Sequence, residues 1–120
     1  MPRSLPTATL DLTGPVCCEP LSGSRMLGNA SALELAVRLK ALADPVRLKL
    51  VSRLLASPTL EACTCELAPA LRLTEATVSH HLKKLLETGL VSKHRNGMNV
   101  HYRLNPDAMR ALTRVLDIDC

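Results

Sequence analysis

Apolar residues recur at helical spacing along most of the chain, and this pattern predicts five amphipathic helices. Local signals place several of their ends. Ser31 followed by Glu34 fits a capping box at the start of the first helix, whereas Asp44-Pro45 joins an N-cap to a proline at the first position of the second. Gly89 is expected just after the fourth. The predicted helices cover residues 31–43, 45–56, 64–70, 75–88 and 106–117.

The composition indicates how these helices pack. The chain has no Trp or Phe and a single tyrosine, Tyr102, so its core must be aliphatic, which favours helices over a large sheet. A chain of 120 residues buries a modest fraction of its surface, and such small folds often gain stability by dimerising. The positions expected to be buried are Leu35, Leu39, Leu42, Val46, Leu50, Val51, Leu54, Leu55, Val78, Leu82, Leu85, Leu86, Met109, Leu112, Val115 and Leu116.

Between residues 90 and 104 the period changes to two, which is typical of strands. Asn96-Gly97 in the middle of this segment is a preferred turn dipeptide, so we expect a β-hairpin with its turn there. A short helix, a tight connection, a second helix and a hairpin follow one another in the order of a winged helix-turn-helix. The predicted fold class is therefore mainly α with a small β-hairpin.

The first thirty residues have a different character. They hold Pro2, Pro6, Pro15 and Pro20, half of the chain's prolines, and show no sustained periodicity. We expect residues 1–30 to be a flexible arm that carries an adjacent cysteine pair. Residues 31–120 then form one winged helix-turn-helix domain for DNA binding and dimerisation. The cysteines of the arm are Cys17 and Cys18.

The formal net charge is +4 and the pI is about 9.0, which suits a partner with a phosphate backbone. The polar side of the predicted helix at 75–88 is suited to the major groove, and the hairpin tip can reach the backbone or the minor groove. A basic helix face is also often only solvated surface, and one of the two adjacent histidines can instead pack inside. The candidate DNA-binding residues are Thr77, Ser79, His80, His81, Lys83, Lys84, Arg95 and Asn96.

No apolar run reaches the roughly 18 residues of a membrane span, and Met1-Pro2-Arg3 does not open a signal peptide. We therefore expect a cytoplasmic protein with no membrane partner. In a reducing cytosol, grouped cysteines bind metals or act in redox chemistry more often than they form structural disulfides. The close pairs at 17–18 and 63–65 are thus candidate sites. We expect Cys120 to be incidental, and the alternative is that it joins a site through the dimer.

Two segments resemble the signature of the ArsR/SmtB family. They are LKALADPVRL at residues 39–48 and TVSHHLKKL at residues 77–85, the latter followed by Gly89-Leu90-Val91. The resemblance implies a bacterial homodimeric winged-helix repressor that leaves operator DNA when an inducer binds. It also implies that the first and last helices form the dimer interface, with the recognition helix at 75–88 and the wing at 90–104.

The resemblance further implies where an inducer binds. Residues 61–67, EACTCEL, resemble the Cys-x-Cys-acid motif of the arsenic- and cadmium-sensing members, some of which complete the site with an N-terminal cysteine pair. Zinc-sensing members use acids and histidines on the last helix, and residues 106–117 contain no histidine, so a zinc site of that type is not expected. The candidate metal ligands are Cys17, Cys18, Cys63 and Cys65.

Cys63 and Cys65 flank one residue at the start of a predicted helix, so both sulfurs can turn to one side, and a helix N-terminus favours thiolates. Thiolates select soft ions. Arsenite and antimonite typically take three thiolates, whereas Cd(II) or Pb(II) can take four, and the cysteines allow either number. The adjacent pair on the arm resembles arsenic sensors, so we expect As(III) or Sb(III) as inducer, with Cd(II) or Pb(II) as the alternative.

Other interpretations stay open at this point. Oxidation of the cysteine pairs can drive release from DNA in a thiol-redox switch, or the cysteines can be small buried hydrophobes. The chain has no nucleophile elbow, phosphate-binding loop or zinc-hydrolase motif, so we expect that it is not an enzyme.

Overall fold

The computed structural model describes Leu21 and residues 26–116. The predicted ligands Cys17 and Cys18, and the terminal Cys120, lie outside the described residues. The elements are α1 (Asn29–Leu42), α2 (Pro45–Ala56), β1 (Glu61–Cys63), α3 (Thr64–Leu71), α4 (Glu75–Glu87), β2 (Val91–Asn96), β3 (Asn99–Leu104) and α5 (Pro106–Leu116). None of the described helices is long and apolar enough to cross a bilayer.

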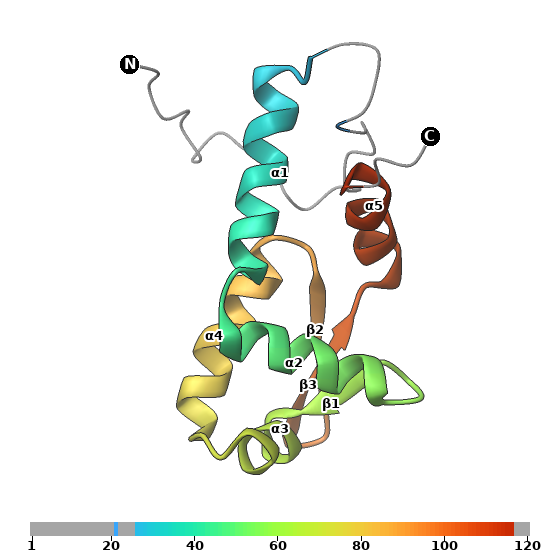
Figure 1. The fold of residues 1–120 in the computed structure, drawn as a ribbon. Helices are drawn as coiled ribbons and strands as arrows, with labels where there is room; N and C mark the ends of the chain where they lie inside the picture. Colours follow the sequence, from blue (N-terminus) through green and yellow to red (C-terminus); the bar gives the residue numbers. More distant parts are fainter. Residues whose placement is uncertain (1–20, 22–25, 117–120) are drawn as a thin grey trace.

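The elements divide between two ends of the molecule (Figure 1). The helices α2, α3 and α4 gather with the sheet at one end, while α1 extends away from them and α5 stands at the other end beside it. The five helices, the helix-turn-helix order and the wing agree with the predicted winged helix-turn-helix class.

The sheet has three strands rather than the two of the predicted hairpin. Its order is β1-β3-β2, and both pairs are antiparallel. Residues 61–63 are too few for a period of two to stand out in the sequence, so β1 becomes visible only through its pairing with β3. In that pairing Cys63 lies opposite His101 and Glu61 lies opposite Arg103. The wing therefore connects directly to the cysteine motif.

The start of the first helix was predicted wrongly. α1 begins at Asn29, and its N-cap is Gly28, which makes no side-chain cap hydrogen bond. The amide of Ala32 already donates to the carbonyl of Gly28 at 2.9 Å, so the helical ladder has begun before Ser31. By contrast, Asp44 caps α2 as predicted, since its side chain accepts from the amide of Arg47 at 3.0 Å.

The hairpin turn lies one residue further along than predicted. Asn96 pairs with Asn99 at the end of the ladder, so Gly97 and Met98 form the turn. Gly97 has a φ of +67° and Met98 does not have a positive φ, as in a type II′ turn, which takes glycine first. The turn thus depends on Gly97 for its backbone and leaves the Met98 side chain 97% exposed at the wing tip.

The core is aliphatic, as predicted, and it draws on all five helices and the sheet. The predicted buried positions are confirmed in the middle of α2 and along α4, where Leu50, Leu54 and Leu82 have no exposed surface. The prediction that Leu55 and Leu116 are buried is wrong. Leu55 is 54% exposed and Leu116 is 48% exposed, because both lie in the last turn of a helix, where this core ends.

Candidate nucleic-acid interface and cysteine site

The candidate recognition helix α4 is positioned by its cap and its apolar face. Thr74 is the N-cap, and its hydroxyl oxygen accepts from the amide of Thr77 at 3.2 Å. Val78, Leu82 and Leu85 are completely buried and pack this helix against α2 and α3. The opposite side of α4 is thereby turned to solvent.

The predicted DNA-binding residues of α4 divide into groups. His80, Lys83 and Lys84 are exposed and Ser79 is half-buried. Thr77 is exposed, but its hydroxyl accepts from that of Thr74 at 2.9 Å, so it also takes part in the cap. The exposed cations and hydroxyls along α4 suit contacts with phosphates and base edges.

His81 is placed differently from its neighbour His80. It is half-buried, and its Nδ1 lies 3.8 Å from Oδ2 of Asp44, the N-cap of α2. That nitrogen is buried and has no hydrogen-bond partner among the described residues. The hydrogen bond from the Arg47 amide, together with the charge of Arg47 and that of His81 when it is protonated, holds the pKa of Asp44 below its usual value. Of the two adjacent histidines, His81 is therefore the one that packs partly inside the protein. Contact of His81 with DNA stays a prediction.

The wing presents the remaining candidates. Arg95 and Asn96 are exposed at the end of β2, next to the turn. On the inner face, Val91, Tyr102 and Leu104 are buried in the core, and this burial raises the pKa of the Tyr102 hydroxyl. The wing is thus anchored at its base, while its tip stands free of the described residues. The sequence placed Met98 in a strand, and its exposure at the wing tip, which follows from the shifted turn, was not predicted.

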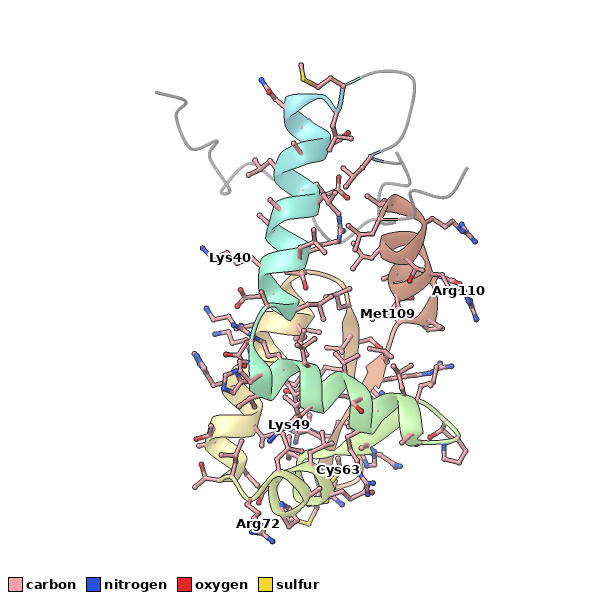
Figure 2. The ribbon with its side chains drawn as sticks, viewed as in Figure 1. Lys40, Lys49, Cys63, Arg72, Met109 and Arg110 are labelled. Atoms are coloured by element: carbon pink, nitrogen blue, oxygen red, sulfur yellow. A yellow bond between two sulfur atoms is a disulfide. The ribbon has the colours of Figure 1, made fainter. Side chains whose placement is uncertain are left out.

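The cysteine motif sits where β1 ends and α3 begins. Cys63 is the N-cap of α3, and its sulfur accepts from the amide of Cys65 at 3.0 Å. The amide of Cys63 donates to Oε1 of Glu66 at 3.4 Å, which completes a capping box with sulfur in the place of a hydroxyl. Figure 2 labels Cys63 and Arg72, the two caps of α3. The motif is therefore held by the backbone of the helix start.

The two sulfurs lie together, as the sequence predicted. The structure joins Cys63 and Cys65 as a disulfide between Cα atoms 5.2 Å apart. Cys63 is buried and Cys65 is exposed, so one sulfur is shielded and the other faces solvent. An oxygen of Glu66 lies within 4.8 Å of both sulfurs. Sequence reasoning missed Glu66 as a donor, although the acid of the Cys-x-Cys-acid motif was its signal. Reduction would free two thiolates beside this carboxylate, a set suited to a thiophilic ion.

Comparison with known proteins gives the family. The model described as bacterial regulatory protein, arsR family, matches residues 44–93, from the cap of α2 into β2. An arsenical resistance operon repressor of Staphylococcus xylosus is 35% identical over 85 residues, which cover 71% of this chain and 79% of that protein. A transcriptional repressor SmtB homolog of Synechocystis sp. (strain ATCC 27184 / PCC 6803 / Kazusa) is 41% identical over 83 residues, covering 69% of this chain and 61% of that protein.

Among solved structures, the crystal structure of the AntR antimony-specific transcriptional repressor matches with a TM-score of 0.64 and 32% identity. The match covers 81% of this chain and 87% of that one, so the shared fold includes the helix-turn-helix, the wing and flanking helices. The chain therefore belongs to the ArsR family of bacterial regulatory proteins, as a transcriptional repressor with a helix-turn-helix DNA-binding fold and not an enzyme.

Proposed function

We propose that this protein is a cytoplasmic homodimeric repressor that binds double-stranded operator DNA and leaves it when arsenite or antimonite binds its cysteine thiolates. The observation that carries the proposal is the position of the paired Cys63 and Cys65 sulfurs at the start of α3, because α3 packs against the candidate recognition helix α4. An ion held at this point bears on the element that leads into α4.

A specific contact supports the coupling between the two helices. Thr64, the residue between the two cysteines, donates its hydroxyl to Oε1 of Glu75 at 3.2 Å. Glu75 is the first residue of α4. An ion that draws both sulfurs toward itself displaces Thr64, and with it the contact that holds the start of α4. If the ion binds the DNA-free arrangement more tightly, DNA must weaken ion binding by the same factor.

The donor set supports a trivalent inducer but needs one more ligand. Cys63 and Cys65 supply two thiolates, and we propose that Cys17 or Cys18 of the N-terminal arm supplies the third. Two of the similar proteins are named for arsenical resistance and for antimony, which fits such a three-thiolate site. A site that uses both arm cysteines has four thiolates and suits Cd(II) or Pb(II) instead.

We expect the exposed residues of α4 and the wing to hold the DNA. In this proposal Lys83, Lys84 and Arg95 contact phosphates, whereas Ser79, Thr77, His80 and Asn96 reach base edges or fix the register. His81 contributes by supporting the packing of α4 on Asp44, which lies 3.8 Å away.

The test is fluorescence anisotropy of a labelled duplex from upstream of the protein's own gene, with reduced protein titrated with arsenite and, separately, with cadmium. We expect release by stoichiometric arsenite. The Cys63→Ser, Cys65→Ser variant should bind DNA and stay bound, and serine suits the N-cap position of Cys63. Cys120→Ser is the matched control and should respond like the wild type. Release of the double variant by arsenite would refute the site, and release by cadmium alone would assign the protein to the four-thiolate class.

The sulfurs of Cys63 and Cys65 lie close enough together to be oxidised as a pair, and this favours a second candidate, a repressor switched by thiol oxidation. In that case peroxide would release DNA from protein freed of metal ions, and a dithiol reductant would restore binding. If peroxide leaves the complex intact at concentrations that oxidise the cysteines, this candidate is excluded.

A further inference from the structure

Two histidines and one glutamate meet on the outer face of the wing sheet, next to the strand that leads into the cysteine motif. They are Glu61 on β1, His94 on β2 and His101 on β3, and we call them the wing cluster. Nε2 of His94 lies 3.0 Å from one carboxylate oxygen of Glu61, and Nδ1 of His101 lies 3.4 Å from the other. The DNA-binding and inducer roles proposed above use none of the three.

The register of the sheet creates this cluster. His94 and His101 are directly paired across β2 and β3, and their rings stack with centroids 5.8 Å apart. Side chains that lie opposite each other on antiparallel strands share a face of the sheet. Glu61 enters from the third strand, which pairs with the other edge of β3. The carboxylate of Glu61 thus contacts one imidazole from each of the other two strands, one through each oxygen.

We propose that the wing cluster is a binding site for a borderline divalent cation, with Zn²⁺ as the fitting example. Imidazole nitrogen and carboxylate oxygen are the donors that such ions accept. Zinc bonds to these atoms are about 2.0–2.2 Å long, so two donors around a tetrahedral ion lie about 3.3 Å apart. Both nitrogen-to-oxygen distances of the cluster match that span.

The exposure of the side chains allows the set to close around an ion. The rings of His94 and His101 are stacked, and the carboxylate of Glu61 contacts both of them. For both histidines to bind one ion, His94 must therefore rotate toward His101. The side chain of His94 is 46% exposed and can do so, whereas Glu61 and His101 are 25% and 18% exposed and are held by their neighbours. A bound ion would tie β1, β2 and β3 together in the middle of the wing.

The chemistry of this site differs from that of the cysteine motif. Thiolates select soft ions, whereas nitrogen and oxygen donors suit borderline ions. The cysteine motif and the wing cluster therefore bind different classes of ion. The wing cluster therefore goes beyond the proposed function: Cys63 pairs with His101 across β1 and β3, but the two sites take different classes of ion, and either can fail without the other.

The test measures Zn²⁺ binding in the variant in which all five cysteines are serine, by competition with a chromophoric chelator. We expect one equivalent of Zn²⁺ per chain. His101→Asn and Glu61→Gln should each weaken binding by about tenfold or more, since even the loss of an outer-shell partner costs that much. Glu87→Gln, an exposed carboxylate on α4, is the matched control and should keep the full affinity. Equal affinity in His101→Asn, or no binding to the folded cysteine-free chain, would overturn the proposal.

If the cysteine-free variant does not fold, a second measurement on the wild type tests the proposal. In the reduced wild type, Zn²⁺ added beyond the thiol equivalents should shift the ring resonances of His94 and His101 together, with His80 as the unshifted reference. Equal shifts of all histidine rings, or none at these two, would also overturn it.

Discussion

Arg38 is the one buried charged side chain among the described residues, with 1% of its surface exposed. Arginine is almost never fully buried unless it is paired, and here Nε donates to the carbonyl of Thr88 at 3.0 Å while the guanidinium also contacts Glu34. Thr88 is the C-cap of α4, where a helix end favours positive charge. A single side chain of α1 thereby ties this helix to the end of the candidate recognition helix.

Replacing Arg38 by methionine should destabilise the protein. The carbonyl of Thr88 would be left buried without its donor, which costs about 1–3 kcal/mol. Urea denaturation followed by circular dichroism measures the change in the free energy of unfolding. The control is Arg110→Met, because Arg110 forms an exposed pair with Asp107 on α5, and such a pair contributes about 0–1 kcal/mol. Equal effects of the two substitutions would contradict the role given to Arg38.

Asp44 should make the stability depend on pH in the acid range. Its pKa in the folded protein is lowered, chiefly by the hydrogen bond from the Arg47 amide and then by the charge of His81. The unfolded chain therefore takes up this proton at higher pH than the folded one, so the contribution is present above the ordinary value of 3.8 and is lost as the pH falls below it.

Asp44→Asn isolates this charge, because asparagine is also a good N-cap. We expect the difference in unfolding free energy between wild type and variant to be constant near neutral pH and to shrink as the pH falls below 3.8. Urea melts over this range measure it. A difference that grows with acid would show that the carboxylate is not stabilised in the folded state.

At the scale of elements, we expect α4 and the wing to contribute differently to DNA binding. The apolar face of α4 is buried in the core, so its exposed side can carry both base and phosphate contacts. The wing is anchored by Val91, Tyr102 and Leu104, and its exposed tip carries Arg95. We therefore expect Arg95 to add affinity rather than sequence preference.

Arg95→Ala should weaken DNA binding about equally for operator and unrelated duplexes. The slope of log K against log salt concentration should fall in magnitude by about 1.8, because each subunit of the proposed homodimer loses one phosphate contact worth about 0.9. Anisotropy titrations at several salt concentrations give this slope. Arg110→Ala removes the same charge from α5 and should leave the slope unchanged. A loss confined to the operator duplex would instead assign Arg95 to base recognition.

At the scale of the whole molecule, α1 is incompletely covered, and Leu116 at the end of α5 is 48% exposed. Only Arg38 and Ala41 are buried on α1, while the predicted apolar stripe of Leu35, Leu39 and Leu42 is half-buried. Both helices stand at the end of the molecule away from the helix-turn-helix (Figure 1). This arrangement supports the proposed dimer, in which these two helices would cover the same pair on a second copy.

We expect sedimentation equilibrium to give twice the 13.0 kDa mass of one chain. Leu116→Glu, at the end of α5, should shift the protein toward the monomer, because it places a charge in the proposed interface. Leu55→Glu is the matched control, since Leu55 is similarly exposed but lies on α2. Dissociation by both variants, or by neither, would argue against an interface made by α5.

The features of the fold that were predicted correctly are those that depend on only a few neighbouring residues. The cap at Asp44, the cap at Thr74 and the glycine after α4 all act over a few residues, and each was found from the sequence. The hairpin was found as well, but its turn was placed one residue early, because Asn96 pairs across the ladder with Asn99. The juxtaposed cysteines were predictable because one residue separates them at a helix start.

The sequence by itself determined the helices, the wing and the proximity of Cys63 to Cys65, since periodicity, caps and short spacings are local properties. Only the tertiary structure decided the rest. The burial of Arg38 against Thr88 joins positions 50 residues apart. The wing cluster likewise depends on the register of three strands, and His81 faces Asp44 only because α4 packs on α2. Such contacts form between elements that the chain brings together in folding, so no short stretch of sequence encodes them.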